Sequence, residues 1–260
     1  MRVFPEDSSS SPPILIIGNS DGIGLATTRQ LLARGQRVVG LSRSESTLGG
    51  SVEGGAAGYQ HIVCNVIGTK FPEELRALLL ENPDLKTVIH CAGVGSSFDA
   101  GDLSGELECF RTNLLSVVEL AAVMVPWWRD HEGGHLVVLS SVADSFVVPD
   151  APSYGASKAG LSRYLRALGL RLRGEGIDVT NVRFGFVDTK MAQAAVKPFE
   201  MTVDRAARVV LEVLRSKPPV RTRPRIVALV GIGLEWAQRV QLLIGAVARP
   251  FVPGRSRRAP

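Results

Sequence analysis

The sequence predicts an α/β fold in three layers, with a doubly wound parallel sheet between two layers of helices. Short apolar runs, typical of strands buried on both faces, alternate with patterns of helical period. The first such run is followed at once by a glycine-rich turn, and the 27 glycines suit a fold with many tight connections. With 260 residues, 45% of them hydrophobic, the chain is long enough for one domain with a large core.

The first half of the chain contains four of the expected strands and two of the expected helices. Gly35 ends the first helix, and Pro72 stands in the first turn of the second, with acidic residues nearby. A glycine-rich connection with little helical drive precedes the third strand. The strands are expected at residues 14–18, 36–42, 59–65 and 86–93, the helices at 22–34 and 71–82, and the connection at 47–58.

The second half continues the alternation with two further strands and three helices. Thr202 is a suitable N-cap for the last of these helices, and Asp204 lies in its first turn, where a negative charge favours the helix dipole. The helices are expected at residues 105–129, 153–173 and 202–216, and the strands at 133–141 and 177–185.

The chain divides into a leader, one domain and an extension. Residues 1–13 are expected to form a flexible leader without the pattern of a secretory signal, and residues 14–222 the single domain. Residues 223–260 are expected to form an apolar helical extension with a basic tail. This extension would cover a substrate pocket, form a subunit interface or lie on a membrane surface. The first two are favoured, and no run reaches the ~18 apolar residues of a membrane span.

The net charge of +5 comes largely from arginines near the C-terminus. No aromatic residues stand within the two groups of arginines, at 221–225 and 255–258, to stack on bases, so a solvated end is favoured over a nucleic-acid site. The three cysteines lack the spacing of a zinc site or a disulfide framework; buried free thiols and a reducing, cytoplasmic location are expected, and no metal is expected. The arginines are Arg221, Arg223, Arg225, Arg255, Arg257 and Arg258, and the cysteines are Cys64, Cys91 and Cys109.

The stretch IIGNSDGIG places glycines at positions 18, 22 and 24, between an apolar strand and a helix. Backbone N–H groups at a helix N-terminus point at an anion, and glycines let a phosphate approach the backbone. Taken alone, the pattern suits a phosphate site and a simple packing turn about equally.

A second group of polar residues has the spacing of an acid–base site. Tyr154 and Lys158 are four apart, so on a helix they share one face. A lysine ammonium beside a tyrosine favours the phenolate and would let it act as a general acid or base. Ser141 ends a strand thirteen residues before Tyr154, where its hydroxyl would polarise a substrate oxygen, whereas the hydroxyl of Ser140 is expected to be satisfied within the turn. Asn113 is a polar residue inside a helix, where asparagine is unfavourable without a reason.

These motifs, in this order, resemble those of the short-chain dehydrogenase/reductase family, over about residues 14–216. The resemblance implies a Rossmann-type fold and a catalytic tetrad of Asn113, Ser141, Tyr154 and Lys158. It also implies that residues 14–222 bind a dinucleotide. The cofactor-binding residues implied are Gly18, Ser20, Asp21, Gly22, Ile23, Gly24, Ser42, Arg43, Asn65, Val66, Cys91, Ala92, Gly93, Tyr154, Lys158, Gly185, Val187 and Thr189.

The sequence departs from the family pattern at three places. His90 and Cys91 replace two asparagines, and His90 is given no catalytic role. Phe184 replaces a proline before Gly185. Asn65 stands where an aspartate usually meets the adenine, and its amide can still form a hydrogen bond there.

The end of the second strand predicts NADP(H) in preference to NAD(H). No acid occupies residues 38–44, where one would bind a ribose 2′-hydroxyl, but Arg43 stands there beside Ser42 and suits a 2′-phosphate. Asp21 fits this prediction least well, because an acid near the glycine loop would repel a phosphate.

The predicted function is the interconversion of a carbonyl and a secondary alcohol, with Tyr154 as acid or base. Met191, Phe199 and Met201 favour an apolar substrate, because they lie where the family builds its substrate lid. The alternative is a non-catalytic NADP(H)-binding redox sensor or scaffold. A homodimer or homotetramer is expected, with no nucleic-acid partner.

Overall fold

The computed structural model describes residues 11–48, 58–95, 97–192 and 197–224, together with residues 226, 233, 236 and 240. Seven parallel strands form one sheet in the order β3-β2-β1-β4-β5-β6-β7. The strands are β1 (Ile14–Ile17), β2 (Val38–Ser42), β3 (Tyr59–Val63), β4 (Thr87–His90), β5 (Gly134–Ser141), β6 (Ile177–Phe184) and β7 (Val220–Arg223). The predicted three-layered, doubly wound fold is confirmed.

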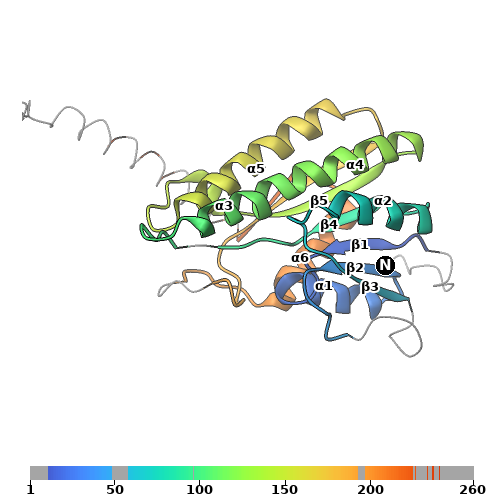
Figure 1. Cartoon of the computed structure of the whole chain (residues 1–260), viewed down its shortest axis with the longest axis horizontal. Coiled ribbons are helices and arrows are strands. Elements are labelled where there is room, and N and C mark those ends of the chain that lie inside the picture. The colour runs from blue at the N-terminus through green and yellow to red at the C-terminus, as the bar shows by residue number, and fades with distance from the viewer. Residues whose placement is uncertain are drawn as a thin grey trace, which may run out of the picture.

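Helices cover both faces of the sheet (Figure 1). One layer contains α2, α4 and α5, and α1 and α6 pack together on the opposite face. The helices are α1 (Gly22–Leu32), α2 (Phe71–Glu81), α3 (Ser104–Phe110), α4 (Ser116–Asp130), α5 (Pro152–Arg171) and α6 (Val203–Ser216).

The first strand shows how the sequence divides the core between these layers. Leu15 and Ile17 belong to the apolar cluster formed with α2, α4 and α5, whereas Ile14 and Ile16 belong to the cluster formed with α1 and α6. Because alternate side chains of a strand point to opposite faces, a continuous apolar run is what a sheet covered on both faces requires.

The predicted helix at 105–129 is not continuous. A π-helical turn, Arg111–Leu115, separates α3 from α4 and contains Asn113. The Ser116 hydroxyl donates a hydrogen bond to the Thr112 carbonyl at 2.7 Å. The asparagine that is unfavourable inside an α-helix therefore lies at a real break in the helix, and π-helical turns are frequent at functional sites.

The same helical stretch, Ser104–Asp130, has the length and apolar composition of a membrane-spanning helix, with a mean hydropathy of 1.4 over its most apolar 18 residues. Half of that window is buried inside the fold, where α4 lies against the sheet. Its apolar character is therefore that of a core helix.

The C-terminal boundary needs a correction. Residues 220–223 form β7, which pairs with β6 at the edge of the sheet, so Arg221 and Arg223 belong to a strand rather than to a solvated tail. One apolar residue and three polar ones would not be expected to form a strand in isolation, but the edge of β6 supplies backbone partners. Residues 226, 233, 236 and 240 are helical, as predicted for the extension. The predictions for residues 1–10 and for the remainder of the extension lie outside the described residues.

Candidate active site

The candidate tetrad is built on three elements that meet at the carboxyl ends of the strands. Ser141 is the last residue of β5, Tyr154 and Lys158 lie on α5, and Asn113 lies in the π-helical turn. Lys158 Nζ lies 5.9 Å from the centre of the Tyr154 ring. A Cβ atom added to Gly93 would lie 3.2 Å from Asn113 Oδ1 and 3.5 Å from Lys158 Nζ. Asn113, Tyr154 and Lys158 therefore lie in one small region, and the catalytic roles expected of the tetrad stay predictions.

Ser141 has a defined hydrogen-bonding state. It is the N-cap of a 3₁₀ turn, Val142–Ser145, and its Oγ accepts a hydrogen bond from the Ala143 amide at 3.2 Å. Since this contact uses a lone pair and leaves the hydroxyl hydrogen, Ser141 can donate to an oxygen in front of it. It also forms a side-chain hydrogen bond with Tyr154.

The electrostatics of Tyr154 are dominated by its burial. Burial raises the pKa of Tyr154 in the chain alone, and the hydrogen bond from Ser141 lowers it only in part. Burial also lowers the pKa of Lys158 to about 8, while its Nζ donates to the Leu139 carbonyl at 3.2 Å. Desolvation is thus the largest influence on the pKa of Tyr154 in the chain alone, and the prediction that Lys158 and an oxidised nicotinamide ring favour the phenolate stays a prediction.

Asn113 acts on its neighbours through its side chain. Its Oδ1 accepts from the Val94 amide at 2.8 Å, and its Nδ2 donates to the Val94 carbonyl at 2.9 Å and to Ser157 Oγ at 3.1 Å. The thiol of Cys109 lies 3.1 Å from the same nitrogen. This amide joins the loop after β4 to α5 directly before Lys158, so it fixes the distance between them.

His90 explains part of this geometry. Its ring is buried at the end of β4, and its Nε2 lies 3.1 Å from Ser116 Oγ, next to the π-helical turn. Burial, followed by the positive charge of Lys158, lowers the pKa of His90 to about 3, so the ring is neutral at physiological pH. A buried, neutral ring bonded to Ser116 is consistent with a structural role for His90, and it gives no support for a catalytic one.

A buried ion pair lies beneath the tetrad, and sequence reasoning missed it. Arg183 donates through Nε to Asp144 Oδ2 at 2.7 Å, and a second nitrogen of the guanidinium donates to the other carboxylate oxygen. The side chains are 17% and 4% exposed. Ser162 donates to the same carboxylate and lies 3.2 Å from Ser140 Oγ, so Ser140 is satisfied within the fold as expected. The available signal was an arginine within the otherwise apolar end of a strand.

The glycine loop fits a bound dinucleotide. Gly18 and Gly22 have positive φ angles of 81° and 52°. A Cβ atom at Gly18 would lie 2.6 Å from the Ala92 amide nitrogen, and one at Gly24 would lie 2.1 Å from the Gly18 carbonyl oxygen. The surface that phosphates would approach is thus backbone, followed by the N-terminus of α1. Ser20 and Ile23 lie in the same loop and helix start.

Asp21 has a different role from the one expected. Its Oδ1 accepts from the Gly22 amide at 2.7 Å, so it caps α1, and its Oδ2 forms an ion pair with Lys190 at 2.7 Å. These two contacts, that with Lys190 first, lower the pKa of Asp21. Because the carboxylate is paired with an ammonium, its repulsion of a nearby phosphate is reduced. Sequence reasoning missed Lys190, which is 169 residues away.

The other predicted cofactor residues lie around the same edge. Ser42 is buried and donates to the Ser44 carbonyl at 2.7 Å, while Arg43 is exposed and lies 3.5 Å from Glu108. Asn65 Oδ1 accepts from the Ile67 amide at 3.2 Å, and Val66 is buried beside it.

Cys91, Ala92 and Gly93 follow β4, and the Cys91 amide donates to the Ile17 carbonyl at 2.7 Å. On the nicotinamide side of the predicted site, Gly185 follows β6, Val187 pairs with Met201, and the Thr189 methyl would lie 3.4 Å from a Cβ at Gly22. The described residues include no group of three or more histidine, cysteine, aspartate or glutamate side chains placed to hold a metal.

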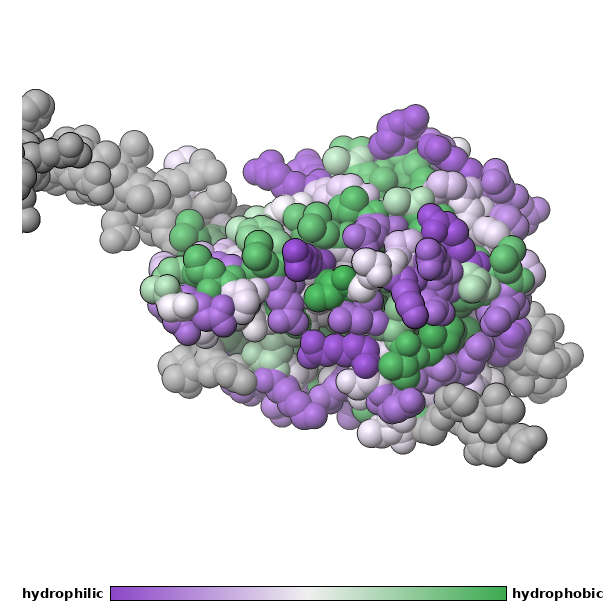
Figure 2. Space-filling model, in the orientation of Figure 1, coloured by the Kyte–Doolittle hydropathy of each residue, from purple (hydrophilic) through white to green (hydrophobic). Residues whose placement is uncertain are grey.

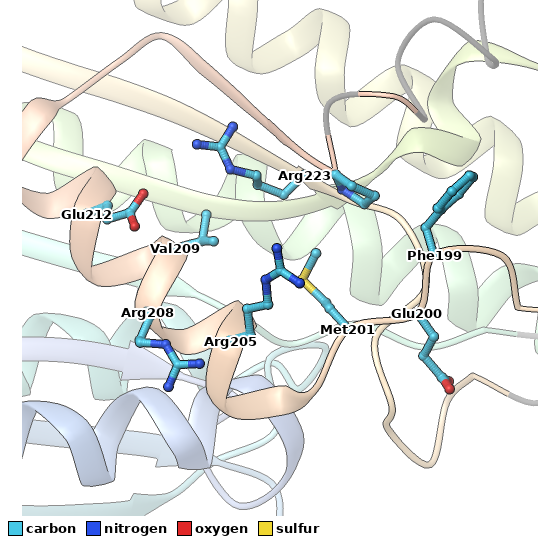
Figure 3. Close-up of a pocket in the computed structure, with 9 residues that line it drawn as sticks. Phe199, Glu200, Met201, Arg205, Arg208, Val209, Glu212 and Arg223 are labelled. Carbon is cyan, nitrogen blue, oxygen red and sulfur yellow. The ribbon is translucent and has the colours of Figure 1, made fainter.

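A pocket of about 660 Å³ lies beside this edge, between α6, the segment before it and the end of β7 (Figure 3). None of the tetrad residues lines it. Its charged walls carry three arginines and two glutamates. The lining residues are Phe199, Glu200, Met201, Arg205, Arg208, Val209, Glu212, Arg223 and Pro224.

Comparisons with known proteins identify the family of the chain. The sequence model described as short chain dehydrogenase matches residues 13–198. An uncharacterised oxidoreductase of Streptomyces coelicolor is 33% identical over 195 residues, which are 71% of this chain and 76% of that protein. The 3-oxoacyl-[acyl-carrier-protein] reductase of Escherichia coli is 27% identical over 183 residues, which are 69% of this chain and 75% of that protein.

Among solved structures, a short-chain dehydrogenase from Burkholderia cenocepacia in complex with NADP has the same fold. The TM-score is 0.75 at 20% sequence identity, over 92% of this chain and 98% of that chain. Since the family model covers more than half of the sequence and the fold and tetrad are present, the chain belongs to the short-chain dehydrogenase/reductase family of oxidoreductases, which act on CH–OH groups with NAD(P).

Proposed function

We propose that the protein interconverts a carbonyl and a secondary alcohol on an apolar substrate, using NADP(H) and Tyr154 as the acid or base. The observation that carries this proposal is the Ser141–Tyr154 hydrogen bond beside the buried ammonium of Lys158. A protein that only bound the cofactor would have no need for a desolvated tyrosine at this position.

Ser141, Tyr154 and Lys158 each have a separate role in the proposed reaction. The bound cofactor supplies or accepts a hydride. Ser141 donates its hydroxyl hydrogen, which goes to Tyr154 in the chain alone, to the substrate oxygen and holds the carbonyl in place. Tyr154 is protonated at neutral pH because burial raises its pKa, which is the state needed to give a proton to the developing alkoxide. Lys158 orients the cofactor ribose and adds positive charge beside the tyrosine.

The preference for NADP(H) is supported by Arg43 and by the environment of Asp21. Arg43 is exposed at the end of β2, the strand next to the glycine loop, and its guanidinium is matched to a 2′-phosphate. Asp21 opposes such a phosphate less than its sequence position suggests, because Lys190 pairs with it.

An apolar substrate is supported by the side chains around the tetrad. Met191 lies over the loop after β4, with its Cγ 3.5 Å from the position of a Cβ at Gly95. Apolar side chains are also exposed on and next to α3, where Figure 2 shows hydrophobic surface. This group consists of Phe98, Leu103, Leu107 and Leu115.

We also propose that the chain forms a homodimer or homotetramer. The edge strand β7 leaves Val220 46% exposed, and unpaired sheet edges are commonly covered in assemblies. Sedimentation equilibrium should give a mass of two or four chains; a monomer at micromolar concentration would contradict this.

The function is tested by NADPH oxidation with a panel of ketones, aldehydes and 3-oxoacyl thioesters. The full chain should oxidise NADPH with at least one of them, and Tyr154→Phe should lower kcat by about 10²–10⁴-fold while the chain still binds NADPH. Tyr164→Phe, a second tyrosine on α5, is the matched control and should stay active. Full activity in Tyr154→Phe would refute the mechanism. NADPH binding without turnover of any substrate would favour the sensor or scaffold alternative.

A further inference from the structure

A chain of hydrogen bonds runs from the glycine loop through β3 to the end of β2. Asn19 Nδ2 donates to the Tyr59 hydroxyl oxygen at 2.7 Å, and that oxygen lies 3.1 Å from His61 Nδ1. His61 Nε2 lies 3.1 Å from the Ser44 carbonyl oxygen, which also accepts from the Ser42 hydroxyl at 2.7 Å. None of the reaction steps above uses Asn19, Tyr59 or His61.

In this series of hydrogen bonds, the donor and the acceptor of each bond can be assigned. A carbonyl oxygen only accepts, so the His61 nitrogen that faces Ser44 must carry the hydrogen. The other ring nitrogen is then an acceptor, and the Tyr59 hydroxyl donates to it. The Tyr59 oxygen in turn accepts from the Asn19 amide. Asn19 and His61 are buried, so these bonds are not exchanged for bonds to water.

The position of the Asn19 side chain depends on a glycine in β2. A Cβ atom at Gly40 would lie 2.0 Å from Asn19 Nδ2, so the amide group occupies the space that a side chain at residue 40 would need. A glycine in the middle of a strand weakens it unless another group approaches its backbone closely. Here the approaching group is the amide of Asn19, the first residue of the hydrogen-bonded network that continues through Tyr59 and His61. One end of this network therefore lies against the middle of β2, and the other end is bonded to the turn that follows β2.

The network ends on both sides of Arg43. Ser42 and Ser44 flank this residue, and their hydrogen bonds fix the backbone before and after it. The Arg43 side chain itself is 66% exposed, and its contact with Glu108 at 3.5 Å is an exposed ion pair that contributes little. The direction in which Arg43 projects thus depends on its backbone, which the network holds.

We propose that Asn19, Tyr59 and His61 are positioning residues for cofactor selection, which hold the Ser42–Ser44 turn so that Arg43 meets the 2′-phosphate of a phosphorylated adenosine. This inference rests on the proposed preference for NADP(H). It concerns binding of the adenosine half only, and it needs no substrate for its test.

The test is a pair of fluorescence titrations of the full chain, one with NADPH and one with NADH. Tyr59→Phe removes only the hydroxyl and with it the hydrogen bonds to Asn19 and His61. The Kd for NADPH should rise about 5- to 10-fold, because the turn that carries Arg43 is then held less firmly. The Kd for NADH should stay within about twofold, because that cofactor lacks the 2′-phosphate that Arg43 would meet. Tyr164→Phe removes a hydroxyl from α5 and should change neither Kd.

A second variant covers the case in which Tyr59→Phe folds poorly. Ser42→Ala removes the bond at the opposite end of the network and should give the same selective loss, smaller in size. Equal weakening of NADPH and NADH binding in both variants would overturn the inference, since it would mean that the network only supports the fold of the loop. Unchanged binding of both cofactors would overturn it as well. A parent chain that binds NADH as tightly as NADPH would instead refute the preference for NADP(H).

Discussion

On the α5 side of the site, Lys158 is buried and Asp144 is 4% exposed, and each is bonded to groups from other elements. On the β2 side, Arg43 is 66% exposed and its contact with Glu108 is long and solvated. Both regions lie at the edge of the sheet where the parallel strands have their carboxyl ends, with β1 and β4 between β2 and β5. The catalytic charges are therefore coupled to the stability of the fold, whereas the cofactor-selecting charge can change without disturbing it.

Replacing Lys158 by methionine should give the largest effect and separate catalysis from stability. The kcat for NADPH oxidation should fall by about 10²–10³-fold, because the variant loses the charge beside Tyr154. The free energy of unfolding of the chain without cofactor should rise by about 2 kcal/mol at pH 7, because the buried ammonium is no longer desolvated. Urea unfolding measures this, with the exposed Lys86→Met as the control.

The pH dependence of stability gives a further check on Lys158. Its pKa falls from 10.5 to about 8 on folding, so between these values the unfolded chain binds more protons than the folded one. The free energy of unfolding of the parent should therefore gain a rising contribution as pH increases from about 8 to 10.5, and Lys158→Met should lack it. An identical pH dependence in both proteins would show that Lys158 is not desolvated.

Replacing Arg183 by glutamine should destabilise the fold and impair catalysis together. It leaves the Asp144 carboxylate buried without its cation, which costs about 3 kcal/mol or more. An unpaired negative charge raises the pKa of Tyr154 further, so the alkaline limb of the pH–rate profile should move to higher pH. The added change Asp144→Asn should restore part of both. If the double variant is as unstable as Arg183→Gln alone, the ion pair is not the cause.

Replacing Arg43 by aspartate should have the smallest effect on the fold and a clear effect on selection. We expect the ratio of the NADPH and NADH affinities to fall by about 10- to 100-fold, since a charge-assisted contact is replaced by a repulsive one. The urea midpoint should stay unchanged, because the side chain is exposed. An unchanged affinity ratio would show that another residue reads the 2′-phosphate, and a lowered midpoint would remove the contrast between the two regions.

The sequence was sufficient for those parts of the fold and site that depend on local pattern. The apolar runs predict six strands, and the spacing of Ser141, Tyr154 and Lys158 brings them together because a strand end and a helix face are local features. The seventh strand was missed because its stability comes from β6. Asp144 with Arg183, and Asp21 with Lys190, were missed because residues far apart in sequence meet only once the sheet is formed.

Because of the π-helical turn between α3 and α4, the geometry of the site depends on the number of residues in this short segment. A π turn holds one residue more than the α turn it replaces, so deleting a residue from Arg111–Leu115 would allow a continuous α-helix. The helix α3, which directly precedes the turn, would then rotate by about 100° relative to α4. Cys109 and Val94 would lose their register with Asn113, and the loop after β4 would come away from α5. A chain shortened here would keep its hydrophobic pattern and its core and yet lose its active site, so relatives of equal helix length are the ones expected to retain the chemistry.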